Sequence, residues 1–105
     1  MRERHYAVAR KLKHAVTLDI PVIDMRVFGS CARGDESEDS DIDIFIEIED
    51  LTKQAKEKIR ELSWRIGLEN SAVISALIFS RDEMENSPLR SSSIVRNIML
   101  EGIPV

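Results

Sequence analysis

The most regular pattern in the chain is the alternation of apolar and acidic residues in segment 41–49, which reads DIDIFIEIE. Successive side chains of an extended strand point to opposite faces of a sheet, so one face carries isoleucines and the other carries mostly acids. The first face holds Ile42, Ile44, Ile46 and Ile48, and the second holds Asp41, Asp43, Phe45, Glu47 and Glu49. The pattern predicts a strand that packs one face into a core and turns carboxylates outward on the other.

Two further segments have the apolar, β-branched composition of strands. Residues 22–28, VIDMRVF, end at Gly29, and residues 71–79, SAVISALIF, are apolar on both faces. We expect the second of these to lie in the centre of the sheet. The stretch SCARG reads as a tight connection with room for one helical turn, and residues 35–40, DESEDS, read as a polar loop.

Apolar residues recur at helical spacing in three other segments, which predicts amphipathic helices. The first is 2–19, the second is 52–66, closed by Gly67, and the third is 89–101, closed by Gly102. The order helix–strand–strand–helix–strand–helix predicts an α+β fold, in which helices pack on one face of a short mixed sheet.

Length and composition narrow the class of protein. The 105 residues suggest one domain, 1–105, and 43% hydrophobic residues are enough for a small core. A net charge of −4 argues against a general nucleic-acid-binding protein, which usually has a basic face. The single cysteine, Cys31, offers neither an internal disulfide nor a cysteine-based zinc cluster. No apolar run approaches the roughly 18 residues that span a bilayer, so we expect no membrane contact and a cytoplasmic location.

The acidic face of segment 41–49 carries the clearest candidate chemistry. Asp41 and Asp43 lie roughly 6.5–7 Å apart along one strand face. Their like charges repel unless a cation lies between them, and hard oxygen ligands suit Mg²⁺, which completes its shell with waters and substrate phosphates. Gly29 allows a ligand to approach the backbone, and Ser30 offers a hydroxyl and N–H groups to an anion. Arg33 could contact phosphate or pair with a loop carboxylate.

Gly29 and Ser30, followed after ten residues by Asp41 and Asp43, form the motif G-S-x10-D-x-D. This motif resembles that of the polymerase-β-type nucleotidyltransferase superfamily. The longer string FGSCARGDESEDSDIDIFIE is similar to its minimal single-domain prokaryotic branch, the MNT proteins, which include the MntA-like antitoxins of HEPN/MNT toxin–antitoxin pairs. The resemblance covers most of the chain and implies a polymerase-β-like nucleotidyltransferase fold.

The resemblance also implies roles by position. Gly29 and Ser30 would hold the triphosphate of ATP or another nucleotide, and the charge of Arg33 would assist them. Asp41 and Asp43 would bind Mg²⁺ and form the catalytic centre. The implied reaction is transfer of a nucleotide monophosphate, an adenylyl group if the donor is ATP, to a protein hydroxyl, with a HEPN-domain protein as partner.

One feature of active family members is missing. They usually carry a third carboxylate on the next strand, where it helps to hold the metal and can act on the acceptor proton. Segment 71–79 contains no acid, and Ser75, or else Ala76, occupies the position. Three functions stay open: an active nucleotidyltransferase antitoxin, an impaired one that neutralises its partner by binding alone, and transfer to a small molecule. The last is disfavoured, because 105 residues leave little room for an acceptor domain.

The remaining polar residues are expected to have ordinary structural roles. We assign His5 to the surface or to packing, Cys31 to a small apolar filler and Glu36 to a solvated turn, although the acids of loop 35–40 could supply a third metal ligand.

The C-terminal residues EGIPV, at the end of segment 89–105, have no evident place in so small a core. We expect this tail and the rim of the site to contact either a second copy of the chain or a HEPN partner. In the alternative, Ile103 and Val105 fold back on the sheet.

Overall fold

The isoleucine face of the alternating strand decides how the layers of the molecule are arranged. In the computed structural model, which describes all 105 residues, four strands form one mixed sheet in the order β3-β2-β1-β4. The strands are β1 (Val22–Phe28), β2 (Ile42–Ile48), β3 (Ile74–Ser80) and β4 (Ile103–Pro104). The helices are α1 (Glu3–Thr17), α2 (Ser30–Arg33), α3 (Lys53–Glu69), α4 (Arg81–Asn86) and α5 (Ser93–Glu101), with a 3₁₀ turn at Pro88–Ser91. None of the helices is long and apolar enough to cross a membrane.

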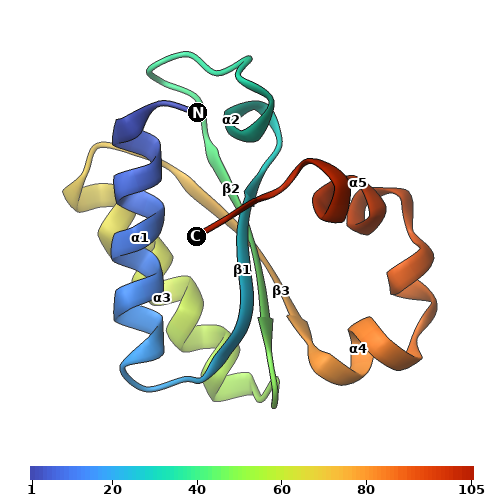
Figure 1. Cartoon of the computed structure of the whole chain (residues 1–105). Helices are drawn as coiled ribbons and strands as arrows, with labels where there is room; N and C mark the ends of the chain where they lie inside the picture. The colour runs from blue at the N-terminus through green and yellow to red at the C-terminus, as the bar shows by residue number, and fades with distance from the viewer.

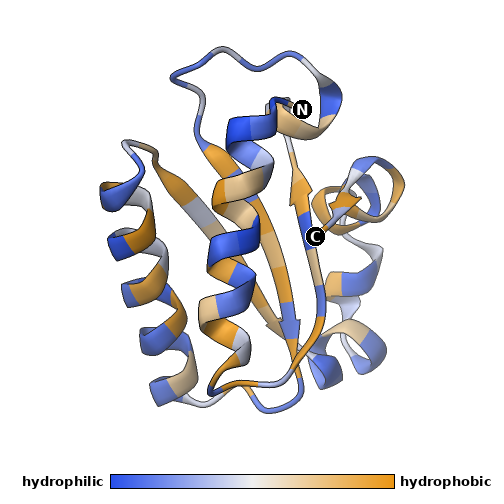
Figure 2. Cartoon of the chain, turned by 60° about the vertical axis from the view of Figure 1, so that its left-hand side comes forward, coloured by the Kyte–Doolittle hydropathy of each residue, from blue (hydrophilic) through white to orange (hydrophobic).

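The main core lies between β2 and the pair α1 and α3. The two helices lie on the same side of the sheet (Figures 1 and 2). All four isoleucines of β2 are fully buried there, against apolar side chains of both helices. The helical side of this core is Val8, Ala9, Leu12, Val16, Ile59, Leu62 and Ile66. Burying an isoleucine side chain stabilises the fold by about 1.5–3 kcal/mol, so a one-residue slip of β2 would lose several such contributions. The register of β2 is therefore firmly fixed.

The opposite face of the sheet is covered over part of its length, which the sequence analysis did not predict. Phe45 lies on the acidic face of β2 but is fully buried, in a second cluster with Met84 of α4 and Val95 and Ile98 of α5. Figure 1 shows α4 and α5 on the side of the sheet away from α1 and α3. The α+β class and the mixed sheet are confirmed, but the helices pack on both faces because Phe45 also needs cover.

The third strand is an edge strand, so the prediction that it is central is wrong. β3 pairs in parallel with β2 alone, and its other edge is free. Its apolar character has a different cause: Ala76 and Ile78 pack against the main core, whereas Leu77 and Phe79 pack against the Phe45 cluster. Burial on two faces produces the same sequence pattern as a central position does.

The C-terminal tail folds back on the sheet, as the alternative expectation had it. Ile103 and Pro104 pair antiparallel with Val27 and Arg26 of β1, and the Val105 N–H donates to the Met25 carbonyl. The tail is thus a fourth strand at the edge of the sheet. Gly102 is confirmed as the residue that ends α5.

Gly67 does not end the second long helix, which continues to Glu69. The residue has a packing role instead. A Cβ at this position would lie 2.7 Å from the Ala72 carbonyl oxygen, where the chain turns out of α3 and runs toward β3. The same close approach allows the Ala72 N–H to donate to the Gly67 carbonyl at 2.8 Å.

We expect Gly67→Ala to destabilise the protein, although alanine normally stabilises a helix by about 1 kcal/mol relative to glycine. The added methyl group meets backbone rather than a flexible side chain, so the expected loss is about 1–3 kcal/mol. Urea denaturation measures it. The neighbouring, solvent-exposed Leu68→Ala is the control and should change stability by less than about 0.5 kcal/mol. A Gly67→Ala protein more stable than the wild type would contradict the packing role.

Candidate functional site

The antiparallel pairing of β1 with β2 brings Gly29 against Asp43. Phe28, the last residue of β1, is the register partner of Asp43, and Gly29 follows directly. Gly29 has a φ of 72°, and a Cβ there would overlap the Asp43 carboxylate oxygen Oδ2. Only glycine satisfies both conditions without strain. Two parts of the motif that are separated in sequence are thus in direct contact.

Asp41 and Asp43 lie at the same end of the acidic face, one exposed and one half-buried. Burial raises the pKa of Asp43, the neighbouring Asp41 carboxylate raises it further, and the positive charge of Arg33 partly offsets both effects. A carboxylate that is desolvated and faces a second carboxylate is poorly stabilised by the protein alone. Two oxygen donors in this state fit a hard divalent cation such as Mg²⁺, which relieves the repulsion.

Ser30 is the first residue of α2, a helix of only four residues that starts immediately after Gly29. The N–H groups of the first turn have no partner within the helix, and no side chain caps them. Ser30 and these N–H groups therefore lie beside the Asp43 carboxylate, on the other side of Gly29. The arrangement offers hydrogen-bond donors next to a pair of cation ligands.

Arg33 ends α2 and is about half exposed. Its guanidinium pairs with Asp35 at 3.2 Å and with Glu101, at the end of α5, at 3.7 Å. Pairing with a loop carboxylate, one of the two roles open to it from the sequence, is therefore present. Its charge still acts on Asp43, so it lies close to the candidate site.

The parallel pairing of β2 with β3 identifies the position of the missing acid. Asp43 pairs with Ser75, and Ile44 pairs with Ala76, so Ser75 lies beside Asp43 on the same face. Ser75 is exposed. Glu47 does not replace the missing carboxylate: Phe45 separates it from Asp43, and it lines a cleft of about 600 Å³ with residues of α4 and α5. Burial and the nearby Asp24 carboxylate raise the pKa of Glu47.

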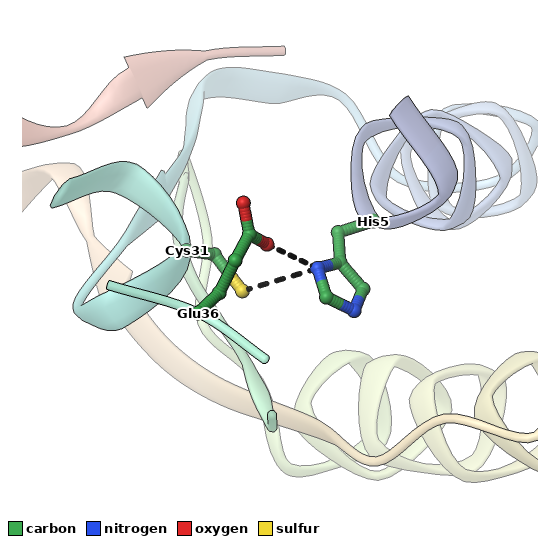
Figure 3. A group of neighbouring side chains, drawn as sticks. All are labelled: His5, Cys31 and Glu36. Carbon is green, nitrogen blue, oxygen red and sulfur yellow. Dashed lines mark hydrogen bonds and ion pairs between the residues drawn. The ribbon is translucent and has the colours of Figure 1, made fainter. Parts of the chain in front are cut away.

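Sequence reasoning missed a buried polar cluster behind the site, formed by His5, Cys31 and Glu36 (Figure 3). His5 Nδ1 faces both the Glu36 carboxylate, with which it forms a hydrogen bond and ion pair, and Cys31 Sγ at 3.7 Å. The prediction that Glu36 lies in a solvated turn is wrong, since its side chain is only 4% exposed. The residues come from α1, α2 and the loop, so no local spacing in the sequence reveals them.

The cluster shifts the protonation of two of its members. Burial acts to raise the pKa of Glu36, but the hydrogen bonds from the His5 ring and the Arg2 backbone N–H outweigh it and lower the pKa to about 2. Burial, together with the Glu36 carboxylate, raises the pKa of the Cys31 thiol to about 12. Cys31 is therefore a neutral thiol and not a nucleophile, and it donates to the Asp41 carbonyl at 3.4 Å.

Comparison with known proteins assigns the chain to a family. The profile of the nucleotidyltransferase domain family matches residues 8–105, so the chain belongs to this family. A Methanocaldococcus jannaschii protein that carries the provisional name protein adenylyltransferase is 37% identical over 68 residues, which are 57% of this chain and 69% of that protein.

Solved structures show the same fold. A chain from a toxin–antitoxin crystal structure with AMP-PNP superposes with a TM-score of 0.63 at 23% identity, over 91% of this chain and 70% of that one. A chain from a mutant of the MntA–HpeT toxin–antitoxin pair gives a TM-score of 0.60 at 23% identity, over 91% and 69%. The polymerase-β-like minimal nucleotidyltransferase fold expected from the motif is confirmed.

We expect Asp43→Asn to leave the fold intact and to keep or raise the melting temperature at neutral pH. A carboxyl whose pKa is raised on folding destabilises the protein when ionised; the cost is absent below the unfolded pKa and complete above the folded one. The gain should therefore shrink as the pH falls toward about 4 and be absent below it. Asp39→Asn, in the exposed loop, controls for the loss of one negative charge. A sharp fall in melting temperature would mean that Asp43 is structural.

Proposed function

We propose that the protein is a Mg²⁺-dependent nucleotidyltransferase that moves an adenylyl group from ATP to a hydroxyl of a partner protein. The observation that carries the proposal is the contact between the Gly29–Ser30 turn and the Asp43 carboxylate, with Asp41 beside it. Membership of the nucleotidyltransferase domain family supports the reaction class. The provisional name of the Methanocaldococcus jannaschii relative supports adenylyl transfer to a protein.

Each residue of the site has a role in this proposal. Asp41 and Asp43 would hold the metal, which when bound supplies positive charge to the phosphates and to the leaving pyrophosphate. Ser30 and the first N–H groups of α2 would bind triphosphate oxygens, and Gly29 keeps the approach to the backbone open. Arg33 would contact phosphate by giving up its exposed pairs with Asp35 and Glu101, which contribute little to stability.

The reaction is an in-line displacement at the α-phosphorus. A hydroxyl oxygen of the acceptor forms the new bond to phosphorus, the bond to the bridging oxygen of the pyrophosphate breaks, and the hydroxyl proton is lost. The chain contributes by holding donor and acceptor in line. Because Ser75 occupies the place of the third acid, a carboxylate that receives the proton must come from Asp41, Asp43 or the acceptor protein, or the proton passes to solvent.

The open site favours a protein acceptor that binds to the same surface. Asp41 and Ser75 are exposed, so the chain alone does not shield a bound nucleotide from water. An apolar patch of Trp64, Leu68 and Val73, which are 70%, 65% and 61% exposed, runs from α3 to the start of β3. Val73 is its member nearest the site, because its carbonyl accepts from Ile42, next to Asp41.

We assign the partner to the class of HEPN-domain toxins, with this chain as the antitoxin. The support comes from the toxin–antitoxin pairs among the solved structures that share the fold. The apolar patch of Trp64, Leu68 and Val73 would seat the partner so that one of its hydroxyl groups reaches the α-phosphate. We identify no residue of the site that would select the base. The choice of ATP as the donor is therefore supported only by the adenylyltransferase relative and the AMP-PNP complex.

A second candidate function is antitoxin action by binding alone, and the observation that favours it is Ser75. With Ser75 beside Asp43, no carboxylate on β3 can assist the metal or take up the acceptor proton, so nucleotide could bind without rapid transfer. Transfer to a small molecule is the third function, and the experiment must distinguish it from the other two.

The test is to incubate the protein with labelled ATP, Mg²⁺ and the product of the neighbouring gene, and to measure the mass of both proteins. We expect one or more adenylyl groups on the partner. Asp41→Asn and Asp43→Asn should each lower the rate by at least about 100-fold, because each removes a ligand that acts in the transition state. A partner that co-elutes with the protein but is not modified would indicate neutralisation by binding without transfer. If the two proteins neither react nor co-elute, the remaining function is transfer to a small molecule.

Ser75→Asp tests whether the missing acid limits turnover. The new carboxylate would stand beside Asp43, complete the metal shell and raise the rate of transfer. Without metal, the new carboxylate adds a like charge beside Asp43, so the melting temperature of the Ser75→Asp variant should be lower than that of the wild type. Addition of Mg²⁺ should raise the melting temperature of the variant more than that of the wild type. Ser75→Asn is the matched control without charge. An equal response to Mg²⁺ in Ser75→Asp and Ser75→Asn would contradict this placement of the metal.

A further inference from the structure

The His5–Cys31–Glu36 cluster brings together three different metal-binding side chains in the interior. Their donor atoms, Nδ1, Sγ and a carboxylate oxygen, all lie within 4.8 Å of one another. His5 and Cys31 are fully buried, and the Glu36 side chain is 4% exposed. In Figure 3 the carboxylate and the sulfur converge on the same ring nitrogen. Acidic side chains are seldom buried unless they are paired, and Glu36 is paired with His5 and lies within reach of Cys31.

The spacing suits a tetrahedral ion. Zinc lies about 2.3 Å from thiolate sulfur and about 2.0–2.1 Å from imidazole nitrogen, which separates the two ligand atoms by about 3.6 Å. Cys31 Sγ and His5 Nδ1 are 3.7 Å apart. The Glu36 carboxylate now contacts Nδ1 directly and would swing outward to admit an ion between them.

The surroundings of His5 also match those of a metal ligand. Its second ring nitrogen, Nε2, faces the Glu38 carbonyl at 3.4 Å. Ligating histidines usually donate their other N–H to a carbonyl or carboxylate, which fixes the ring with one nitrogen directed at the metal. The Asp41 carbonyl, 3.4 Å from Cys31 Sγ, or a water could provide a fourth oxygen.

Zinc binding would release protons, because Cys31 must lose its proton to become a thiolate ligand and His5 Nδ1 must carry none to coordinate the ion.

We propose that His5, Cys31 and Glu36 form a structural zinc site, separate from the Asp41–Asp43 pair. Soft sulfur and nitrogen donors select zinc, whereas the two aspartates select magnesium. The ion would join α1, α2 and loop 35–40, and the Asp41 carbonyl, released from the Cys31 thiol proton, would lie within reach of the ion. Its effect would be to hold the loop that leads into the candidate active site.

The experiment uses the untagged chain with Asp41→Asn and Asp43→Asn, so that the aspartate pair contributes no metal binding. Metal content after gel filtration is measured by mass spectrometry, and zinc is replaced by cobalt for absorption spectroscopy. We expect about one zinc per chain, a sulfur-to-cobalt charge-transfer band, and a melting temperature raised by at least about 4 °C by zinc and lowered by a chelator.

Matched variants locate the site. His5→Gln and Glu36→Gln should lose the zinc, whereas the exposed His14→Gln and Glu38→Gln should keep it. Cys31→Ser should lose the cobalt band; if it does not fold, the band in the parent chain decides whether sulfur is a ligand. If the chain retains no zinc, shows no sulfur band and keeps its melting temperature, the three residues form only a hydrogen-bonded cluster. Zinc retained equally in all folded variants would place the ion elsewhere, and either result would overturn the proposal.

Discussion

The burial of the four isoleucines on one face of β2 is the constraint on which the rest of the structure depends. Because α1 and α3 seal that face, the register of β2 cannot slip, and the aspartates must lie on the other side. The pairing with β1 then places Asp43 against Gly29, and the pairing with β3 places it beside Ser75. The geometry of the candidate site follows from core packing on the face that the site does not use.

Phe45 divides the acidic face into two regions with different properties. On one side of it, Asp41 and Asp43 remain accessible; on the other, Glu47 lies under α4 and α5. The Glu47 carboxylate at the covered end shares its cleft with Arg90 and Arg96, whereas the open end has the first turn of α2 beside it. A single aromatic residue thus separates the acids of segment 41–49 that can meet a ligand from those that cannot.

Local patterns in the sequence predicted the parts that depend on local order. The alternation of β2, the bounds of β1 and the choice of Ser75 over Ala76 as first preference all agree with the structure. Three features escaped prediction for physical reasons. α4 has one buried apolar residue, so it shows no periodicity, and only the capping box of Ser80 and Glu83 indicates it. The edge position of β3 depends on which strands pair. The buried cluster of His5, Cys31 and Glu36 depends on side chains that are distant in sequence. Neither feature leaves a local pattern in the sequence.

The buried contacts of Glu36 explain how a loop so rich in charge can lead into a defined site. A buried ion pair adds little net stability, since desolvation offsets most of the attraction, but it strongly disfavours any arrangement that breaks it. Glu36 holds the middle of the loop to His5, and the Cys31 thiol holds the Asp41 carbonyl where the loop enters β2. The backbone that leads into the aspartate pair is therefore fixed from within. Contacts within the chain can in this way hold two carboxylates in a constant position at the open end of the sheet.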